Sequence, residues 1–194
     1  MSSHLARRAG QAVYVSLLFL LVGITDLTGR PGKRKLRKIA TSDEVRRKRE
    51  RAERELRARA EEIGRSGPWG PALRTTLVDW CSRGGGRNLL DQNAPKQPAL
   101  SCLMRLHLYF VVDGPTRDAL RDLRYPGGEL LSWDAPGDEP RAKISEPCAV
   151  RSKAILRTCV SDPAAITLRA LRERPGTLVE WTLTTRYHTV PGTR

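Results

Sequence analysis

The side chains of this sequence that could carry chemistry are chiefly its four cysteines, Cys81, Cys102, Cys148 and Cys159. No two of them have the C-x₂-C spacing that is typical of a zinc site. In an exported domain an even number of cysteines predicts disulfide bonds, here two. In a cytoplasmic protein the same residues would be four buried thiols. Three pairings are possible, and proximity in the sequence favours Cys81–Cys102 with Cys148–Cys159.

The histidines His4, His107 and His188 are the other candidates for chemistry. His107 and His188 lie on the polar sides of two predicted strands, where we expect surface imidazoles. A Cys–His nucleophile pair would need a free thiol beside an imidazole. The sequence has no G-x-S-x-G or H-E-x-x-H motif and no glycine-rich dinucleotide fingerprint. We therefore predict no catalytic residue, no cofactor and no metal ligand, and an enzyme is the least favoured class of function.

A hydrophobic stretch near the N-terminus decides the compartment in which these cysteines would lie. Residues 9–25 contain no charge, and 17 residues of helix span roughly 25 Å, close to the lower limit for a bilayer core of about 30 Å. No small-x-small cleavage site follows, so an uncleaved signal-anchor is favoured over a cleaved signal peptide. The apolar residues that we assign to the membrane are Val13, Leu17, Leu18, Phe19, Leu20, Leu21 and Val22.

The net charge of +14 is concentrated just after this stretch, because residues 30–63 contain 14 Lys/Arg and 7 Asp/Glu. The first part is a polybasic cluster of Lys33, Arg34, Lys35, Arg37 and Lys38. We expect a solvated segment beside the membrane, with anionic lipid headgroups as the first polyanionic partner and nucleic acid as the second. By the positive-inside rule the C-terminal part should stay in the cytoplasm, whereas the cysteines favour an extracytoplasmic domain.

A charged helix is predicted over residues 41–63. Thr41 and Glu44 have the T-x-x-E spacing of a capping box, and Gly64 suits the C-terminal cap. At 100° per residue the apolar side chains fall on one narrow seam. This seam allows weak self-association as a coiled coil, but its broken heptads favour a lone stalk or a helix packed on its own domain. The seam consists of Val45, Ala52, Leu56 and Ile63.

The remainder alternates predicted strands and short helices. In the strand over 101–112 the even positions, Cys102 to Val112, should face the core. In the strand over 178–190, Val179 and Trp181 should lie on one face and Glu180 on the other. The other predicted elements are a helix over 71–81, a short helix over 116–124, a short strand over 129–133, an acidic loop over 134–140, an extended segment with a turn over 148–159, and a helix over 162–173 with Asp162 as its N-cap.

These elements predict an α+β fold in three regions. Residues 1–29 form the signal-anchor, 30–64 the basic segment and helical stalk, and 65–194 a compact domain with a small antiparallel or mixed sheet packed with short helices. We expect a single-pass membrane protein whose extracytoplasmic domain has a binding or structural role, with an envelope protein as a further expected partner. The alternative is a cytoplasm-facing protein whose polybasic segment binds anionic lipid or nucleic acid.

Overall fold

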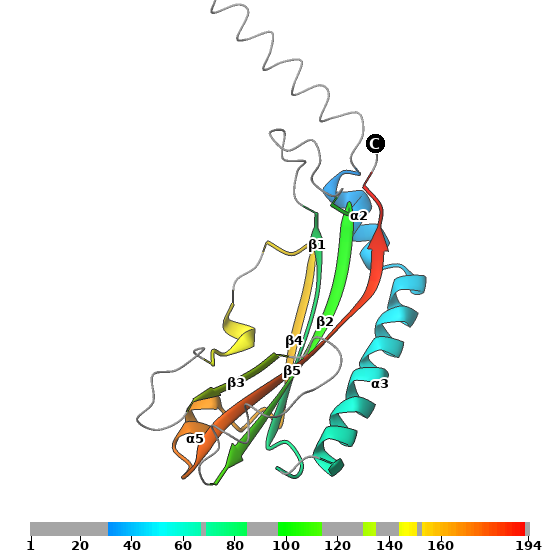
Figure 1. Cartoon of the computed structure of the whole chain (residues 1–194). Helices are drawn as coiled ribbons and strands as arrows, with labels where there is room; N and C mark the ends of the chain where they lie inside the picture. The colour runs from blue at the N-terminus through cyan, green and yellow to red at the C-terminus, as the bar shows by residue number, and fades with distance from the viewer. Residues whose placement is uncertain are drawn as a thin grey trace, which may run out of the picture.

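The computed structural model describes residues 31–66, 69–84, 97–113, 130–134, 144–150 and 153–192 (Figure 1). The predicted membrane segment, the helix over 116–124 and most of the acidic loop over 134–140 lie outside these residues. None of the helices that the structure describes has the length and the apolar character needed to cross a membrane. The fold is α+β, as the sequence predicts.

Within the described residues the sheet has five strands, and every pair of neighbouring strands is antiparallel. Their spatial order is β3-β5-β2-β1-β4, which makes β3 and β4 the edge strands. The predicted strands over 101–112 and 178–190 are confirmed as the long neighbours β2 and β5, and the short predicted strand over 129–133 corresponds to β3. The bounds are Arg74–Arg83 for β1, Leu100–Val112 for β2, Leu130–Asp134 for β3, Leu156–Asp162 for β4 and Thr177–Val190 for β5.

Strand β1 replaces the helix that the sequence predicts over residues 71–81. Thr75, Thr76 and Val78 are β-branched, and such residues favour a pleated strand over a helix. β1 is paired on both sides, with β2 and with β4. The helical spacing of Leu73 and Leu77 was therefore a coincidence within a short apolar run, for which periodicity does not separate a helix from a buried strand.

One face of the sheet carries the main core. As predicted, the even positions from Cys102 to Phe110 are buried, and Met104, Leu106, Leu108 and Phe110 pack with Val179, Trp181 and Leu183 of β5. The odd positions were expected to face solvent, but His107 and Tyr109 are also buried. Their burial follows from a second layer of chain on the opposite face of the sheet.

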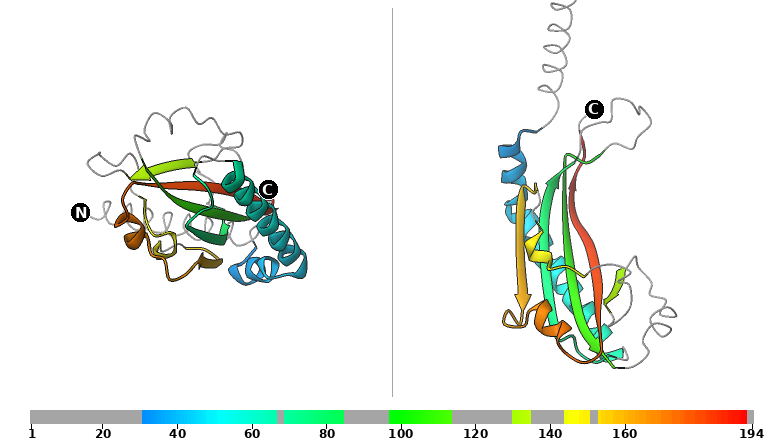
Figure 2. Two further views of the ribbon diagram at one scale, coloured as in Figure 1. Left: turned by 90° about the horizontal axis from the view of Figure 1, so that it is seen from below. Right: turned by 90° about the vertical axis from the view of Figure 1, so that its left-hand side faces the viewer.

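Helix α3 (Asp43–Ser66) lies along the core face of the sheet (Figures 1 and 2). Ala52 and Leu56 are buried in the same cluster as the strands, with Ile63 packed against it, and Val45 is buried at the end nearer the N-terminus. The predicted helix and its seam are confirmed, and the helix packs on its own domain. The seam is occupied by the sheet, so it offers no apolar surface for a coiled coil.

The polybasic segment is a helix, α2 (Lys33–Ala40), which the sequence did not predict, although its cationic side chains are exposed as expected. Leu36 and Ala40 are buried against Cys81, Leu100 and Cys102. α2 therefore caps one end of the sheet, beside the end of β5 (Figure 1). Both α2 and most of α3 precede the predicted boundary at residue 64, yet they pack on the sheet that follows it. The boundary itself stays a prediction.

The predicted capping box is wrong, because Thr41 ends α2 instead of starting α3. Its hydroxyl donates to the Arg37 carbonyl over 3.0 Å, and it is Ser42 Oγ that accepts from the Val45 amide, over 3.4 Å. The carboxylate of Glu44 pairs with Lys48 at 2.7 Å. Gly64 lies inside α3, which continues to Ser66.

The opposite face of the sheet is covered by a short 3₁₀ helix, η1 (Pro147–Ala149), and by α5 (Leu168–Arg172). The predicted helix over 162–173 is confirmed only at its end, because Asp162 still belongs to β4 and Thr167 is the N-cap. Leu168 and Leu171 pack with Ile144, Leu178 and Tyr109 in a second cluster. This cluster lies at the end of the sheet away from α2 (Figure 1).

Candidate functional site

The sheet face opposite α3 carries two rows of polar side chains, which the strand register places side by side. In the first row Ser161, Thr76, His107 and Thr182 are neighbours on four adjacent strands. In the second row Arg74, Tyr109, Glu180 and Ser132 are neighbours on four strands. We call these eight residues the polar array. Seven of them are buried and Ser161 is half-buried, so they are candidates for more than a solvated surface.

Arg74 organises the β1 side of the polar array. Its guanidinium donates to both carboxylate oxygens of Glu146, one of them at 3.0 Å, and to Ser161 Oγ at 2.8 Å. Ser161 Oγ also lies 3.0 Å from Thr76 Oγ1. The same guanidinium lies 5.6 Å from the centre of the Tyr109 ring, a cation–π contact. The charge of Arg74 is therefore matched by a bidentate carboxylate and a ring face.

Glu180 organises the β5 side. Its Oε1 accepts from the Tyr109 hydroxyl at 3.2 Å and lies 2.7 Å from His107 Nδ1. Because the carboxylate is an acceptor, we assign the Nδ1 proton to the imidazole. Burial raises the pKa of Tyr109 and the Glu180 carboxylate raises it further, so the phenol remains a donor. His107 is a buried partner of Glu180, and the predicted surface imidazole is wrong at this position.

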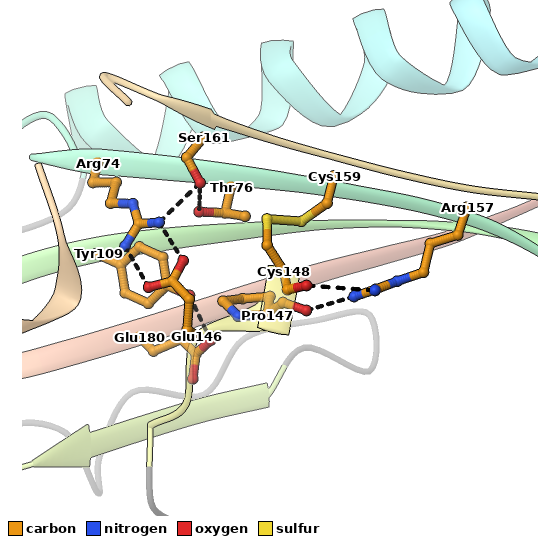
Figure 3. Close-up of a disulfide and its surroundings, with 10 residues drawn as sticks. All are labelled: Arg74, Thr76, Tyr109, Glu146, Pro147, Cys148, Arg157, Cys159, Ser161 and Glu180. Atoms are coloured by element: carbon orange, nitrogen blue, oxygen red, sulfur yellow. Dashed lines mark hydrogen bonds and ion pairs between the residues drawn. A yellow bond between two sulfur atoms is a disulfide. The ribbon is translucent and has the colours of Figure 1, made fainter. Parts of the chain in front are cut away.

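The Cys148–Cys159 disulfide brings a distant segment onto the polar array (Figure 3). It joins η1 to β4, and Arg157 of β4 donates to the Pro147 carbonyl over 2.6 Å and to that of Cys148 over 3.5 Å. The residue before η1 is Glu146, the partner of Arg74. The disulfide therefore holds the carboxylate that neutralises the buried guanidinium.

The other disulfide, Cys81–Cys102, joins directly opposed residues of β1 and β2 on the core face. Both predicted pairings are thus present in the structure, and no cysteine that it describes is free. Both sulfurs belong to the cluster that holds α2, through Leu36 and Ala40. The disulfide and the basic helix are consequently parts of one packed unit.

A second buried polar group on the α3 face was not anticipated from the sequence. The carboxylate of Asp79 accepts from the Tyr187 hydroxyl at 2.6 Å and lies 2.6 Å from Arg49 Nε. Its side chain is 2% exposed, and that of Arg49 is 25% exposed. Burial raises the pKa of Asp79, and the contacts with Tyr187 and Arg49 oppose part of this shift. The cluster joins α3 to β1 and β5.

The polar array has the residue types of a hydrolase but not the connectivity. A Ser or Thr nucleophile needs an imidazole nitrogen that accepts its proton. Here Ser161 bonds to Arg74 and Thr76, while Glu180 and Thr182 both contact His107 at Nδ1. No described hydroxyl bonds to Nε2, the nitrogen that would have to accept the proton of a nucleophile. All described cysteines are oxidised, and the described residues contain no cluster of His, Cys, Asp or Glu that could hold a metal ion. His188, the other candidate imidazole, lies opposite Cys102 and away from His107.

The predicted polybasic residues are brought together on α2. All five cationic side chains are exposed, whereas Leu36 and Ala40 face the sheet. Within the described part of the chain none of the five forms an ion pair with a carboxylate. The predicted residues of the membrane segment, from Val13 to Val22, lie outside the described residues.

The sequence predicted the cysteine pairing correctly but missed most of the polar array. Arg74 and Thr76 were assigned to a helix, and Glu180 to the polar face of a strand. The available signal was the charged and hydroxyl residues at alternate positions of the predicted strands over 101–112 and 178–190. Only the register of these strands shows which of those residues lie opposite each other. Comparison of the chain with protein-family models, with curated proteins and with solved structures finds no match.

Proposed function

We propose that this protein is a membrane-tethered binding protein whose α+β domain lies outside the cytoplasm. The N-terminal hydrophobic stretch would be the tether, and the domain would act through its surfaces and without covalent chemistry. The observation that carries the proposal is the pairing of all described cysteines into two disulfides. Disulfides persist in oxidising compartments and are rare in the cytoplasm.

The internal pairing of the polar array supports a binding or structural role over an enzymatic one. Each of its charged groups already has a partner in the protein, so a substrate would have to displace a buried ion pair. Such displacement leaves an unpaired buried charge, which costs several kcal/mol. The array is better explained as the polar interior between the sheet and the layer that holds η1 and α5.

The packing of α2 bears on which side of the membrane the domain occupies. Leu36 shares a cluster with Cys81 and Cys102, so the basic helix and the disulfide belong to the same side of any membrane. The positive-inside rule and the cysteine rule thus make opposite predictions for one rigid unit. A cytoplasm-facing protein that binds anionic lipid or nucleic acid is the alternative, favoured by the basic residues after the hydrophobic stretch.

Thiol labelling of the full chain, acid-trapped in the cells that express it and alkylated in denaturant so that the buried Cys81 and Cys102 can react, tests the proposal. We expect no alkylation of the four cysteines before reduction and complete alkylation after it, with a reporter fused after Arg194 active outside the cytoplasm. The C148S/C159S variant is the control, because it retains one disulfide and should label only after reduction as well. Alkylation of all four cysteines without reductant, with the reporter inside, would establish the cytoplasm-facing alternative.

A further inference from the structure

The exposed side of α2 carries five cations and no carboxylate within eight residues, and it has a fixed orientation. At 100° per residue, Arg34 and Lys38 lie opposite the buried side chains of Leu36 and Ala40. Lys35 and Arg37 flank them. The helix presents these four cations away from the domain, because its apolar side is held by the sheet.

The place of α2 in the fold and in the chain limits what this surface can meet. Lys33, its first residue, follows the uncharged stretch that ends at Thr25 by only eight positions. Fully extended, eight residues reach at most about 29 Å. If the stretch lies in a bilayer, α2 is confined to the neighbourhood of the headgroups. A nucleic acid would have to compete with a lipid surface that is already present at this distance.

We propose that the cationic face of α2 binds the anionic headgroups of the bilayer in which the chain is tethered, and thereby orients the domain. This inference rests on the tether of the proposed function. Cations near an anionic leaflet are attracted to its surface potential within about a Debye length. Because α2 is packed on the sheet, the attraction acts on the whole domain and not on a flexible linker.

Docking of α2 on the bilayer would also determine which end of the sheet faces away from it. α2 packs at the end of the sheet where β1 ends and β2 begins, near Leu100 and Cys102. α5 and the cluster around Leu168 lie at the other end of the sheet (Figure 1). With α2 on the headgroups, the α5 end points away from the bilayer and is the part presented to a partner.

The test uses lysine acetylation, read by mass spectrometry, on the full chain in lipid nanodiscs. One set of discs contains phosphatidylcholine alone, and the other contains equal parts of phosphatidylcholine and phosphatidylglycerol. We expect slower acetylation of Lys33, Lys35 and Lys38 in the anionic discs at about 0.15 M salt, and recovery of the rate at about 1 M salt, where the Debye length falls to about 3 Å. Lys48, on α3, is the internal reference and should change less.

Two matched variants keep all three reporter lysines. R34Q/R37Q removes two cations from α2, and R51Q/R54Q removes two exposed cations from α3. Each cation near the membrane surface contributes about fivefold to the equilibrium, so R34Q/R37Q should lower the ratio of docked to undocked domain by roughly 25-fold. R51Q/R54Q should leave the protection unchanged. All four residues are exposed, so both variants should fold, which far-UV circular dichroism checks.

The outcomes separate this inference from the proposed function. If alkaline carbonate strips the chain from the discs, the tether and the proposed function fail. If the chain is retained but the α2 lysines react equally in both kinds of disc, the lipid inference alone fails. Equal protection of Lys48, or an equal effect of R51Q/R54Q, would contradict the orientation. Protection by added duplex DNA, with none from phosphatidylglycerol, would assign the surface to nucleic acid.

Discussion

At the scale of single residues, the structure contains two charged pairs in which one partner is almost fully buried and the other is partly exposed. Arg74 with Glu146 lies on one face of the sheet, and Asp79 with Arg49 on the other. A buried charge is tolerated only with a partner and with hydrogen bonds to its remaining polar atoms. Each pair joins segments that are far apart in the sequence. Its contribution to stability is tested by replacing one partner and measuring the cost of leaving the other charge unpaired.

Replacement of Asp79 by Asn tests the effect of burial on this carboxyl group. Because burial raises its pKa in the folded state, the folded protein retains the Asp79 proton in a pH range where the unfolded chain has lost it. Stability from this group is therefore present at low pH and is lost as the pH rises through the folded pKa. We expect D79N to gain stability relative to the wild type as the pH rises through this window, measured by urea unfolding at several pH values.

The opposite trend would contradict this prediction. If D79N loses stability relative to the wild type as the pH rises, Tyr187 and Arg49 lower the pKa of Asp79 by more than burial raises it. The E44Q variant is a useful control, because Glu44 is an exposed partner of Lys48 and its pKa is lowered, mainly by that hydrogen bond.

The two partners of the Arg74–Glu146 pair should respond unequally to substitution. The Arg74 side chain is 5% exposed and that of Glu146 is 36% exposed. E146Q leaves a buried guanidinium without its counter-charge, and we expect a loss of roughly 2–4 kcal/mol. R74M leaves a carboxylate that water already reaches, so its cost should be smaller. Equal losses in denaturant unfolding would show that exposure does not control the energetics of this pair.

At the scale of elements, α2 and α3 are held to the sheet by narrow apolar seams within otherwise charged surfaces. The seam of α3 consists of Val45, Ala52 and Leu56, and the seam of α2 consists of Leu36 and Ala40. An eight-residue helix is not stable in isolation in water, so α2 exists because its apolar side is buried. Its stability should therefore depend on a single side chain to an unusual degree.

Truncation of Leu36 tests the docking of α2. Leu36 is fully buried, and loss of a buried leucine side chain costs about 2–5 kcal/mol. We expect L36A to lose an amount within this range and to lose hydrogen-exchange protection over residues 33–40 before the sheet does. R34A is the matched control, because its exposed side chain should change stability by less than about 0.5 kcal/mol. Retained protection in L36A would mean that α2 is held by other contacts.

At the scale of the whole molecule, the two disulfides stabilise different parts of the fold. Cys81–Cys102 lies under α2 at one end of the sheet, and Cys148–Cys159 holds the segment with η1 to the edge strand β4. A disulfide stabilises mainly by restricting the unfolded chain, typically by 2–4 kcal/mol. The second one also keeps Glu146 beside Arg74.

The C148S/C159S variant is expected to lose about 2–4 kcal/mol of stability, and in addition to free the segment over 144–150. Hydrogen exchange should therefore rise in this segment, and E146Q should cost less in this background than in the wild type, because the pair is already weakened. The C81A/C102A variant is the comparison: it should leave the effect of E146Q unchanged. Additive effects in both backgrounds would contradict the coupling.

Local sequence patterns were sufficient to predict the elements whose spacing is long and regular. α3 has a narrow apolar seam, β2 has an apolar side chain at every even position from Cys102 to Val112, and the cysteine pairing followed from proximity. β5 alternates from Val179 to Leu183. These are properties of local spacing, which one stretch of chain carries alone. They were enough to predict an α+β fold, though not the order of its strands.

Which polar residues are buried, and which partners they have, depends on long-range packing and not on any local pattern. Arg74 and Glu146, or Asp79 and Arg49, meet because strand register and helix packing bring them together. The same packing turned residues 74–83 into a strand and the polybasic segment into a docked helix. Burial of a polar group depends on what covers it, and the covering segments here come from other parts of the chain.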